Sequence, residues 1–591
     1  MKKLLDLLTE EMQSAFESAG YDRELGRVTI SNRPDLCEYQ CNGAMAGAKQ
    51  YKKAPIMIAN DVAAKLAESK VFSEAVAVAP GFLNLKLSEE YLLQFVEGMR
   101  SEEKFGLEKP EVIKTIVVDY GGANVAKPLH VGHIRPAVIG ESLKRINRYV
   151  GHKVIGDVHL GDWGLQMGLV ITELQVRQPE LVYFDENFQG EYPEEAPFTI
   201  SELEEIYPTA SAKSKEDAAY KARAMEATFK LQNGVRGYRA LWRHIMNVSV
   251  ADLKKNYGRL QVEFDLWKGE SDVQDLIPEM VAYMKEGGYA YISEGALVVD
   301  VKEETDTKEM PPCMILKSDG ASLYNTTDLA TIMERVKLYD PDEIIYVTDK
   351  RQDLYFEQVF RCARKTKLVD EGVELKWVGF GTINGKDGKP FKTRDGGVMR
   401  LENLIRETKD EMYRKIREGR DGEEITEEEA QNIAEIVAIS ALKYGDLSNQ
   451  ASKDYIFDID RFTSFEGDTG PYILYTIARI KSILKKYEEQ GGDLSKATLR
   501  VADNASTKEL MMQLSQFNAM MQSACEELAP HKICAYIYDL SNAFNRFYHE
   551  NPILKEENED RKQGFIALLA LTKDLLETCI DVLGFSAPEM M

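Results

Sequence analysis

Cysteine and histidine are scarce in this sequence, which has seven of each among its 591 residues. No two cysteines form a CxxC pair, so the sequence predicts neither a zinc site nor a disulfide framework, and we expect no protein-bound metal. Scattered, unpaired thiols are typical of a protein that works in the reducing cytoplasm.

Long apolar runs are also missing. No stretch reaches the roughly 18 apolar residues that a membrane-spanning helix needs, so we expect no membrane partner. Residues 1–12 contain two lysines and several leucines, but Asp6, Thr9, Glu10 and Glu11 interrupt the apolar run. This pattern predicts a short amphipathic helix and argues against a secretory signal peptide.

Positive charge is in deficit, because 74 basic residues face 98 acidic ones and the net charge is −24. A protein that bound nucleic acid by electrostatics over its whole surface would be basic. Charge alone therefore argues against a nucleic-acid partner. Any RNA would have to bind local basic stripes on an acidic body.

The length exceeds the roughly 250–300 residues that one hydrophobic core supports, so we expect about three domains. Residues 1–105 mix helical and strand patterns and predict an α+β domain. Residues 106–425 alternate strands and helices, as in a doubly wound Rossmann-type sheet, with a helical insertion at about 180–250. Later strands are expected at 296–301, 314–316, 343–347 and 377–383. Residues 426–591 predict an all-α bundle, so the fold class is multidomain α/β plus all-α.

The tightest histidine pair, His130 and His133, lies between a predicted strand at 115–120 and a predicted helix at about 133–150. Gly132 between them would let a base or ribose approach the backbone, and a helix N-terminus offers N–H groups to phosphate. The two imidazoles can donate to phosphate oxygens as charge builds up. The alternative is a histidine pair that only caps a buried helix start.

Residues 124–135, which read NVAKPLHVGHIR, resemble the HIGH signature of class I aminoacyl-tRNA synthetases in its arginyl form. Similar blocks follow in family order at 158–168, 257–271, 316–328 and 457–472, so the resemblance covers nearly the whole chain. It implies a Rossmann-type class I catalytic domain, an added N-terminal domain that contacts the outer corner of tRNA, and an anticodon-binding bundle. The implied activity is ATP-dependent activation of L-arginine and its transfer to arginine tRNA.

Class I synthetases also carry a lysine-rich KMSKS loop, and residues 385–397 hold its place here. Only Lys392, Thr393 and Arg394 remain of that signature, and the alternative is an exposed basic hairpin. The resemblance implies that Lys127 supplies the missing charge. It makes His130, His133, Lys127 and Lys392 the expected catalytic residues. The expected ATP contacts are Gly132, His130, His133, Lys389, Lys392 and Arg394, and Mg²⁺ would accompany ATP.

A site for arginine needs carboxylates and other acceptors on rigid elements, because a guanidinium is always charged and has five donors. By resemblance, the arginine contacts are Asp119, Asn124, Tyr324, Asp328 and Gln352. Asp328 is the expected guanidinium partner, and Tyr324 shares its helix face at the i, i+4 spacing. Such a pocket would leave carboxylates poorly paired with lysine or citrulline, so no editing domain is expected.

Aromatic and basic residues alternate along the predicted C-terminal helices, an arrangement that suits stacking on unpaired RNA bases. The alternative for any one tyrosine is plain helix-bundle core. By resemblance, the expected tRNA contacts are Tyr39 and Asn84 in the N-terminal domain and Tyr472, Arg479, Tyr536, Arg546 and Met591 in the C-terminal domain.

Two other functions stay open: a class I synthetase for another amino acid, and a tRNA-binding paralogue without catalysis. A cysteinyl enzyme is disfavoured because the sequence has no cysteine–histidine zinc set. The presence of His130, Gly132, His133 and Lys392 argues against a non-catalytic paralogue. We expect a cytoplasmic monomer.

Overall fold

The first hundred residues form an α+β unit in the computed structural model, which describes residues 1–391, 398–419 and 425–591. Its antiparallel sheet has the order β1 (Val28–Ile30), β2 (Tyr39–Cys41), β4 (Phe82–Leu87), β3 (Phe72–Val78). Three helices pack against it, and a fourth leads out of it: α1 (Leu4–Ser18), α2 (Gly43–Tyr51), α3 (Pro55–Leu66) and α4 (Glu89–Ser101). In α1, apolar residues four apart line one buried face, as expected for an amphipathic helix.

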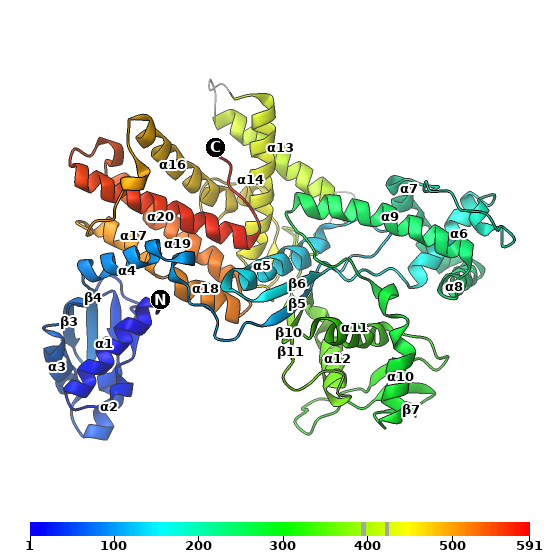
Figure 1. Ribbon diagram of the computed structural model, residues 1–591, viewed down its shortest axis with the longest axis horizontal. Helices are drawn as coiled ribbons and strands as arrows, with labels where there is room; N and C mark the ends of the chain where they lie inside the picture. The colour runs from blue at the N-terminus through cyan, green and yellow to red at the C-terminus, as the bar shows by residue number, and fades with distance from the viewer. Residues whose placement is uncertain (392–397, 420–424) are drawn as a thin grey trace.

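A parallel four-stranded sheet lies at the centre of the molecule (Figure 1), in the order β11-β10-β5-β6. Its strands and helices follow along the chain as β5 (Thr115–Asp119), α5 (Ile134–Val150), β6 (Lys153–Asp157), α11 (Tyr324–Tyr339), β10 (Glu343–Asp349), α12 (Asp353–Lys365) and β11 (Glu374–Phe380). Since β6 and β10 lie on opposite sides of β5, the strand order reverses beside β5. Ligands bind at such a point, outside the carboxyl ends of the strands.

The strands expected at 296–301 and 314–316 do form, but they do not join this sheet. They are β8 (Ala296–Val299) and β9 (Cys313–Leu316), which make a separate antiparallel sheet with β7 (Ala290–Ser293). The two-residue turn Glu294-Gly295 has positive φ at both positions, which folds β8 back on β7 as a tight hairpin. Buried apolar runs do not reveal the strand direction, so the sequence alone could not distinguish the two sheets.

Four helices form the insertion at the right of Figure 1: α6 (Leu165–Arg177), α7 (Ile200–Glu216), α8 (Ala218–Gln232) and α9 (Arg236–Arg259). This helical unit is wider than the expected segment at about 180–250. A further helix, α10 (Leu276–Glu286), connects it to the small antiparallel sheet.

The C-terminal part is helical, as expected, and lies at the upper left of Figure 1. Its helices are α13 (Leu401–Gly419), α14 (Glu427–Leu447), α15 (Ile459–Phe462), α16 (Gly470–Glu489), α17 (Ala505–Ser515), α18 (Phe517–Glu526), α19 (Pro530–Glu550) and α20 (Glu559–Leu583). Two short strands, β12 (Ile383–Asn384) and β13 (Tyr455–Ile456), pair the end of the α/β part with this bundle. Among the described residues, no helix combines the length and apolar character needed to cross a membrane.

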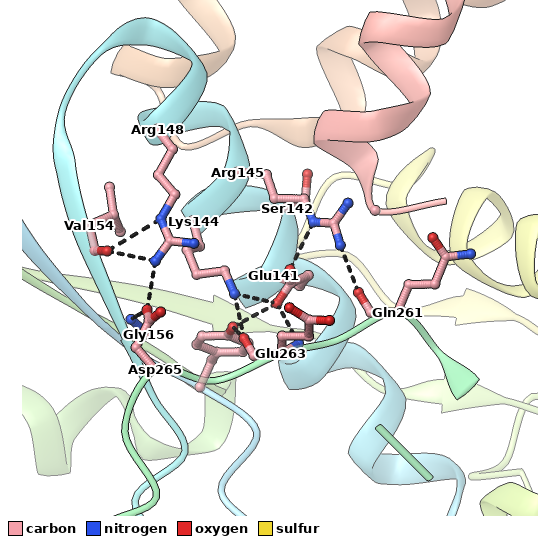
Figure 2. A network of polar contacts seen from close by, with 12 residues as sticks. Glu141, Ser142, Lys144, Arg145, Arg148, Val154, Gly156, Gln261, Glu263 and Asp265 are labelled. Atoms are coloured by element: carbon pink, nitrogen blue, oxygen red, sulfur yellow. Dashed lines mark hydrogen bonds and ion pairs between the residues drawn. The ribbon is translucent and has the colours of Figure 1, made fainter. Parts of the chain in front are cut away.

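A buried polar network fixes helix α5 in place (Figure 2). The carboxylate of Glu141 accepts hydrogen bonds from the Tyr120 hydroxyl (2.7 Å) and from Arg145 (2.8 Å), and it pairs with Lys144 at 2.9 Å. Burial alone would raise the pKa of Glu141, but the neighbouring cations Lys144, Arg145 and Lys443 outweigh it, so the pKa is lowered. From α14, the Lys443 ammonium donates to the carbonyls of Leu260 and Gly584. Helix α5 is therefore held between the parallel sheet and the C-terminal bundle.

Candidate active site and tRNA-binding surface

The histidine pair forms the first turn in front of helix α5. The Gly132 N–H donates to His130 Nδ1 (3.1 Å), and the His130 N–H donates to His133 Nδ1 (3.0 Å). Burial lowers the pKa of both rings, that of His133 to about 3, so both are neutral near pH 7. With Nδ1 accepting, the single ring proton lies on Nε2. The pair thus caps the helix start and still keeps an N–H donor on each ring.

Gly132 has a local reason to be glycine. A Cβ at this position would lie 2.8 Å from Cε1 of the His130 ring, closer than carbon atoms pack. The ring position that caps the helix therefore excludes any side chain at Gly132. The residue is also exposed, so its backbone is open to a ligand.

Residues 399–401, which follow the lysine-rich loop in the sequence, pair with residues 129–131, which include His130. The Val131 N–H donates to the Met399 carbonyl (2.9 Å), the Leu401 N–H donates to the Leu129 carbonyl (2.9 Å), and His130 and Arg400 form an antiparallel bridge. On the near side, Lys389 is exposed in a tight turn closed by the bond from the Gly385 N–H to its carbonyl. Lys392 and Arg394 lie outside the described residues. The described end of the loop is therefore anchored next to His130.

Lys127 lies close to the histidine pair. After burial, its charge is the next cause that lowers the pKa of His130. Its ammonium lies 4.4 Å from the ring centroid of Tyr207, which belongs to helix α7 of the insertion. Among the described residues, no carboxylate comes within 4.0 Å of it. The positive charge is thus held without being neutralised.

Asp119 ends strand β5, as expected, but it already has an internal cation. Its Oδ2 accepts from the Arg335 guanidinium at 2.6 Å, and Asp157 at the end of β6 accepts from the same nitrogen at 2.8 Å. Arg335 is buried, and a buried guanidinium needs such partners. Asp119 and Asp157 therefore balance Arg335 first, and a substrate contact of Asp119 stays a prediction.

Carboxylates without an ion-pair partner gather beside this group. Asp328, in the second turn of α11, accepts a hydrogen bond from the Tyr355 hydroxyl, and burial raises its pKa. Burial, followed by the nearby charges of Asp162 and Asp328, raises the pKa of Glu270 to about 7. Like-charged, desolvated carboxylates of this kind favour an added cation. This acidic cluster is chemically suited to a ligand with a positive group.

The other predicted arginine contacts lie around this acidic cluster. Tyr324 begins α11, one turn before Asp328, and is 75% exposed. The Asn124 side chain lies against Gly161, where a Cβ would come 2.1 Å from Asn124 Oδ1. Gln352 is exposed before α12, at the carboxyl end of β10, and no described contact joins it to Asp328. Four of the five lie around one sheet edge with Gln352 at its rim.

Sequence reasoning missed Glu270, Arg335 and Tyr355. Parallel bridges pair residues 157 and 160 with 266 and 269, which brings Glu270 to the end of β6. Residues 257–271, which contain Glu270, form one of the blocks that resemble the family. That resemblance could have identified Glu270 as a site residue. Arg335 and Tyr355 gave none, because their partners lie far away in the sequence.

A pocket of about 630 Å³ opens in the C-terminal part, a size that suits a small ligand or a single base. It brings together residues from α13, α16, α19 and the C-terminus. The Arg479 guanidinium lies 4.9 Å from the ring centroids of both Tyr475 and Tyr548. The pocket is lined by Tyr472, Arg479 and Met591, all predicted tRNA contacts, and by Lys415, Phe465, Tyr475, Asn545 and His549 among others.

The other predicted tRNA contacts lie outside this pocket. Tyr39 and Tyr536 are only 3% and 6% exposed, so their rings belong to the cores of their domains, and this burial does not support the tRNA contacts expected of them. Arg546 pairs with Glu509 at 2.9 Å on the surface. Asn84 accepts from Gln40 at 2.9 Å on the outer face of the N-terminal sheet. Alternating aromatic patterns could not separate core rings from exposed ones.

Three family models match consecutive parts of the chain. Residues 2–87 match the arginyl tRNA synthetase N terminal domain, residues 97–459 the class I (R) tRNA synthetase catalytic domain, and residues 473–591 the DALR anticodon binding domain. The chain is 65% identical to the arginine–tRNA ligase of Agathobacter rectalis and 57% identical to that of Alkaliphilus oremlandii, each over 100% of both chains. The crystal structure of arginyl-tRNA synthetase from Plasmodium falciparum matches with 25% identity and a TM-score of 0.79, over 100% of both chains. This chain therefore belongs to the arginyl-tRNA synthetases, within the class I family.

Proposed function

We propose that this chain is an ATP-dependent arginine–tRNA ligase, which converts L-arginine to arginyl-adenylate and transfers it to the 3′ end of arginine tRNA. The observation that carries the proposal is 65% identity, over the full length of both chains, with a curated arginine–tRNA ligase. The histidine pair at a helix start and the unpaired carboxylates beside the sheet edge agree with it.

In the first step, the arginine carboxylate attacks the α-phosphate of ATP in line. A C–O–P linkage forms and pyrophosphate leaves. His130 and His133 donate from Nε2 to phosphate oxygens, and Lys127 adds positive charge beside them. Catalysis then depends on positioning and charge stabilisation, without a covalent enzyme intermediate.

Lys389, Lys392 and Arg394 would bind the polyphosphate from the lysine-rich loop. Mg²⁺ would enter with ATP, held by the phosphates and water. Within residues 1–391, 398–419 and 425–591, no three metal-binding side chains lie close enough together to hold an ion. We therefore propose no dedicated set of protein ligands for Mg²⁺.

The arginine side chain would bind at the acidic cluster. Asp328 and Glu270 supply acceptors for the guanidinium, with Tyr324 and Gln352 at the rim, while Asp119 and Asn124 contact the amino-acid end. An analogue that cannot pair both carboxylates would leave buried charge unsatisfied, which can discriminate by about four to five decades. An editing site is then unnecessary.

For the second step, the 2′-hydroxyl of the terminal tRNA ribose would attack the carbonyl carbon of arginyl-adenylate, so that an ester forms, the acyl–phosphate bond breaks and AMP leaves. The pocket lined by Tyr472, Arg479 and Met591 would hold an anticodon-loop base, and Asn84 would contact the outer corner of the tRNA. We propose that the enzyme acts as a monomer in the cytoplasm, where tRNA is charged and where its seven free, buried thiols stay reduced.

ATP–pyrophosphate exchange with each amino acid, with and without tRNA, tests the proposal. Exchange that depends on arginine and is followed by charging of arginine tRNA is the expected result. Exchange with a different amino acid would make this a synthetase of other specificity. Tight tRNA binding with no exchange under any condition would make it a non-catalytic paralogue.

A further inference from the structure

Helix α7 of the insertion presents two side chains to the nucleotide site. A capping box of Thr199 and Glu202 fixes the start of the helix, and Glu204 and Tyr207 follow three residues apart on one face. The neighbouring residues Leu203 and Ile206 are buried in the insertion. One side of α7 thus packs within the insertion, and another side reaches the catalytic part of the chain.

The first contact is between Tyr207 and Lys127. The ammonium lies 4.4 Å from the ring centroid, well inside the range of roughly 6 Å for a cation–π interaction. A ring holds a cation by its quadrupole and leaves the net charge intact, whereas a carboxylate would cancel that charge. Because no described carboxylate lies within 4.0 Å of Lys127, its charge stays available to an anion.

The second contact ties α7 to the segment after the lysine-rich loop. Glu204 forms an ion pair with Arg400, whose backbone bridges His130. Glu204 is mostly buried, at 15% exposed, whereas Arg400 is 51% exposed. A half-exposed pair of this kind contributes little stability on its own. The Glu204–Arg400 pair matters for position, because it joins α7 to the segment beside His130 through a contact that does not involve Tyr207.

We propose that Tyr207 is a positioning residue of the activation step, and that its ring orients the Lys127 ammonium toward the phosphates of ATP. This inference rests on the proposed function, because it assigns Lys127 to ATP. It also gives the insertion a role in catalysis. The alternative is that Tyr207 only fills space between the insertion and the loop that carries Lys127.

Substitutions at Tyr207 separate these two roles. Tyr207→Phe keeps the ring and loses the hydroxyl, whereas Tyr207→Leu keeps apolar bulk and loses the ring face. The measurement is arginine-dependent ATP–pyrophosphate exchange on the full-length enzyme with tRNA present. We expect Tyr207→Leu to lower kcat/KM for ATP by about three- to tenfold, with a smaller change in KM for arginine, because Tyr207 also lies near Tyr324. Tyr207→Phe should stay within about twofold of wild type.

Tyr192 provides a matched control in the same insertion. It is also a half-buried tyrosine with a cation over its ring, Arg236 at 5.4 Å, and that cation has no link to Lys127. Tyr192→Leu should leave kcat/KM for ATP unchanged. An equal loss in both leucine variants would overturn the proposal, because the insertion would then act only through its stability.

A double-mutant cycle with Lys127→Ala gives the decisive comparison. If Tyr207 acts through Lys127, Tyr207→Leu should cause no further loss once Lys127 is removed. Additive losses, or a Tyr207→Leu enzyme with wild-type kinetics for ATP, would contradict the inference. Exchange activity of the wild-type enzyme tests the proposed function itself. If the wild-type enzyme showed no exchange, the proposed function would fail, and this result is distinct from a failure of the inference about Tyr207.

Discussion

The rings of His130 and His133 lie with their centroids 4.0 Å apart, and both use Nδ1 as an acceptor for a backbone N–H at the start of α5. The same contacts that cap the helix fix the tautomer, so each Nε2 carries a proton. The two interpretations of this motif, helix cap and phosphate donor, are therefore compatible.

This arrangement predicts that the cap and the donor can be separated at His130. His130→Asn keeps a side-chain acceptor for the helix start and loses Nε2. We expect turnover in the exchange reaction to fall by roughly 10²–10³, with little change in arginine affinity or melting temperature. His130→Ala should lose the cap as well, and so should also melt earlier. Near-normal turnover in the asparagine variant would remove His130 from the chemistry.

The pKa of Glu270 predicts how arginine binding depends on pH. In the free enzyme this pKa is raised to about 7, so the carboxylate is charged above that pH and protonated below it. A cationic substrate favours the charged form, so KM for arginine should rise as pH falls from 8 to 6. Glu270→Gln should have a high KM with a much flatter profile. A wild-type KM that is flat over this range would mean that Glu270 does not face the substrate.

Lys127 and Lys392 are predicted to act on the same polyphosphate. Lys392 lies outside the described residues, so this prediction comes from the sequence alone. In a double-mutant cycle on the activation step, alanine substitutions at the two positions should be non-additive. Strictly additive effects would mean that Lys127 does not supply the positive charge that the incomplete KMSKS loop lacks.

Arg479 and Arg546 are two arginines of the same helical bundle with different surroundings. Arg479 lies between two tyrosine rings in the C-terminal pocket, and Arg546 pairs with Glu509 outside it. We expect Arg479→Ala to raise KM for tRNA about tenfold, the scale of one lost stacking contact. Arg546→Ala is the control and should change it by less than about twofold. Equal effects would argue for general electrostatics and against a base-binding pocket.

A net charge of −24 raises the question of how RNA binds at all. At physiological salt the screening length is about 8 Å, so distant carboxylates barely oppose lysines and arginines at a local site. Affinity for tRNA should then fall steeply between 50 and 200 mM salt, as phosphate contacts require. Filter binding at several salt concentrations measures this slope. A flat profile would exclude binding through local basic stripes.

Much of the fold follows from features that are local in the sequence. The strand expected at 115–120 and the helix expected at about 133–150 form as β5 and α5, and the C-terminal part is helical as expected. Contacts between distant segments are another matter. The pairing of Asp119 with Arg335 joins residues 216 positions apart, and no spacing rule foresees it. Glu204 and Tyr207 also gave no signal, because their partners Arg400 and Lys127 lie in other parts of the chain.

The burial of individual side chains is the second feature that the sequence did not predict. Tyr39 and Tyr536 lie in segments that resemble RNA-binding parts of the family, yet both rings are in the core. Tyr472 lies in a similar pattern and lines a pocket. For the two helix residues, Tyr472 and Tyr536, alternation of aromatic and basic residues is compatible with either outcome, because helix rotation in the bundle decides which face is covered.

Charging purified arginine tRNA with each of the twenty amino acids in turn, in the presence of ATP, tests the specificity of the proposed ligase. Under the proposed function, arginine alone should be attached, and Asp328→Ala should abolish the attachment while the variant still binds tRNA. Attachment of any other amino acid at a comparable rate, or undiminished charging by the Asp328 variant, would contradict it.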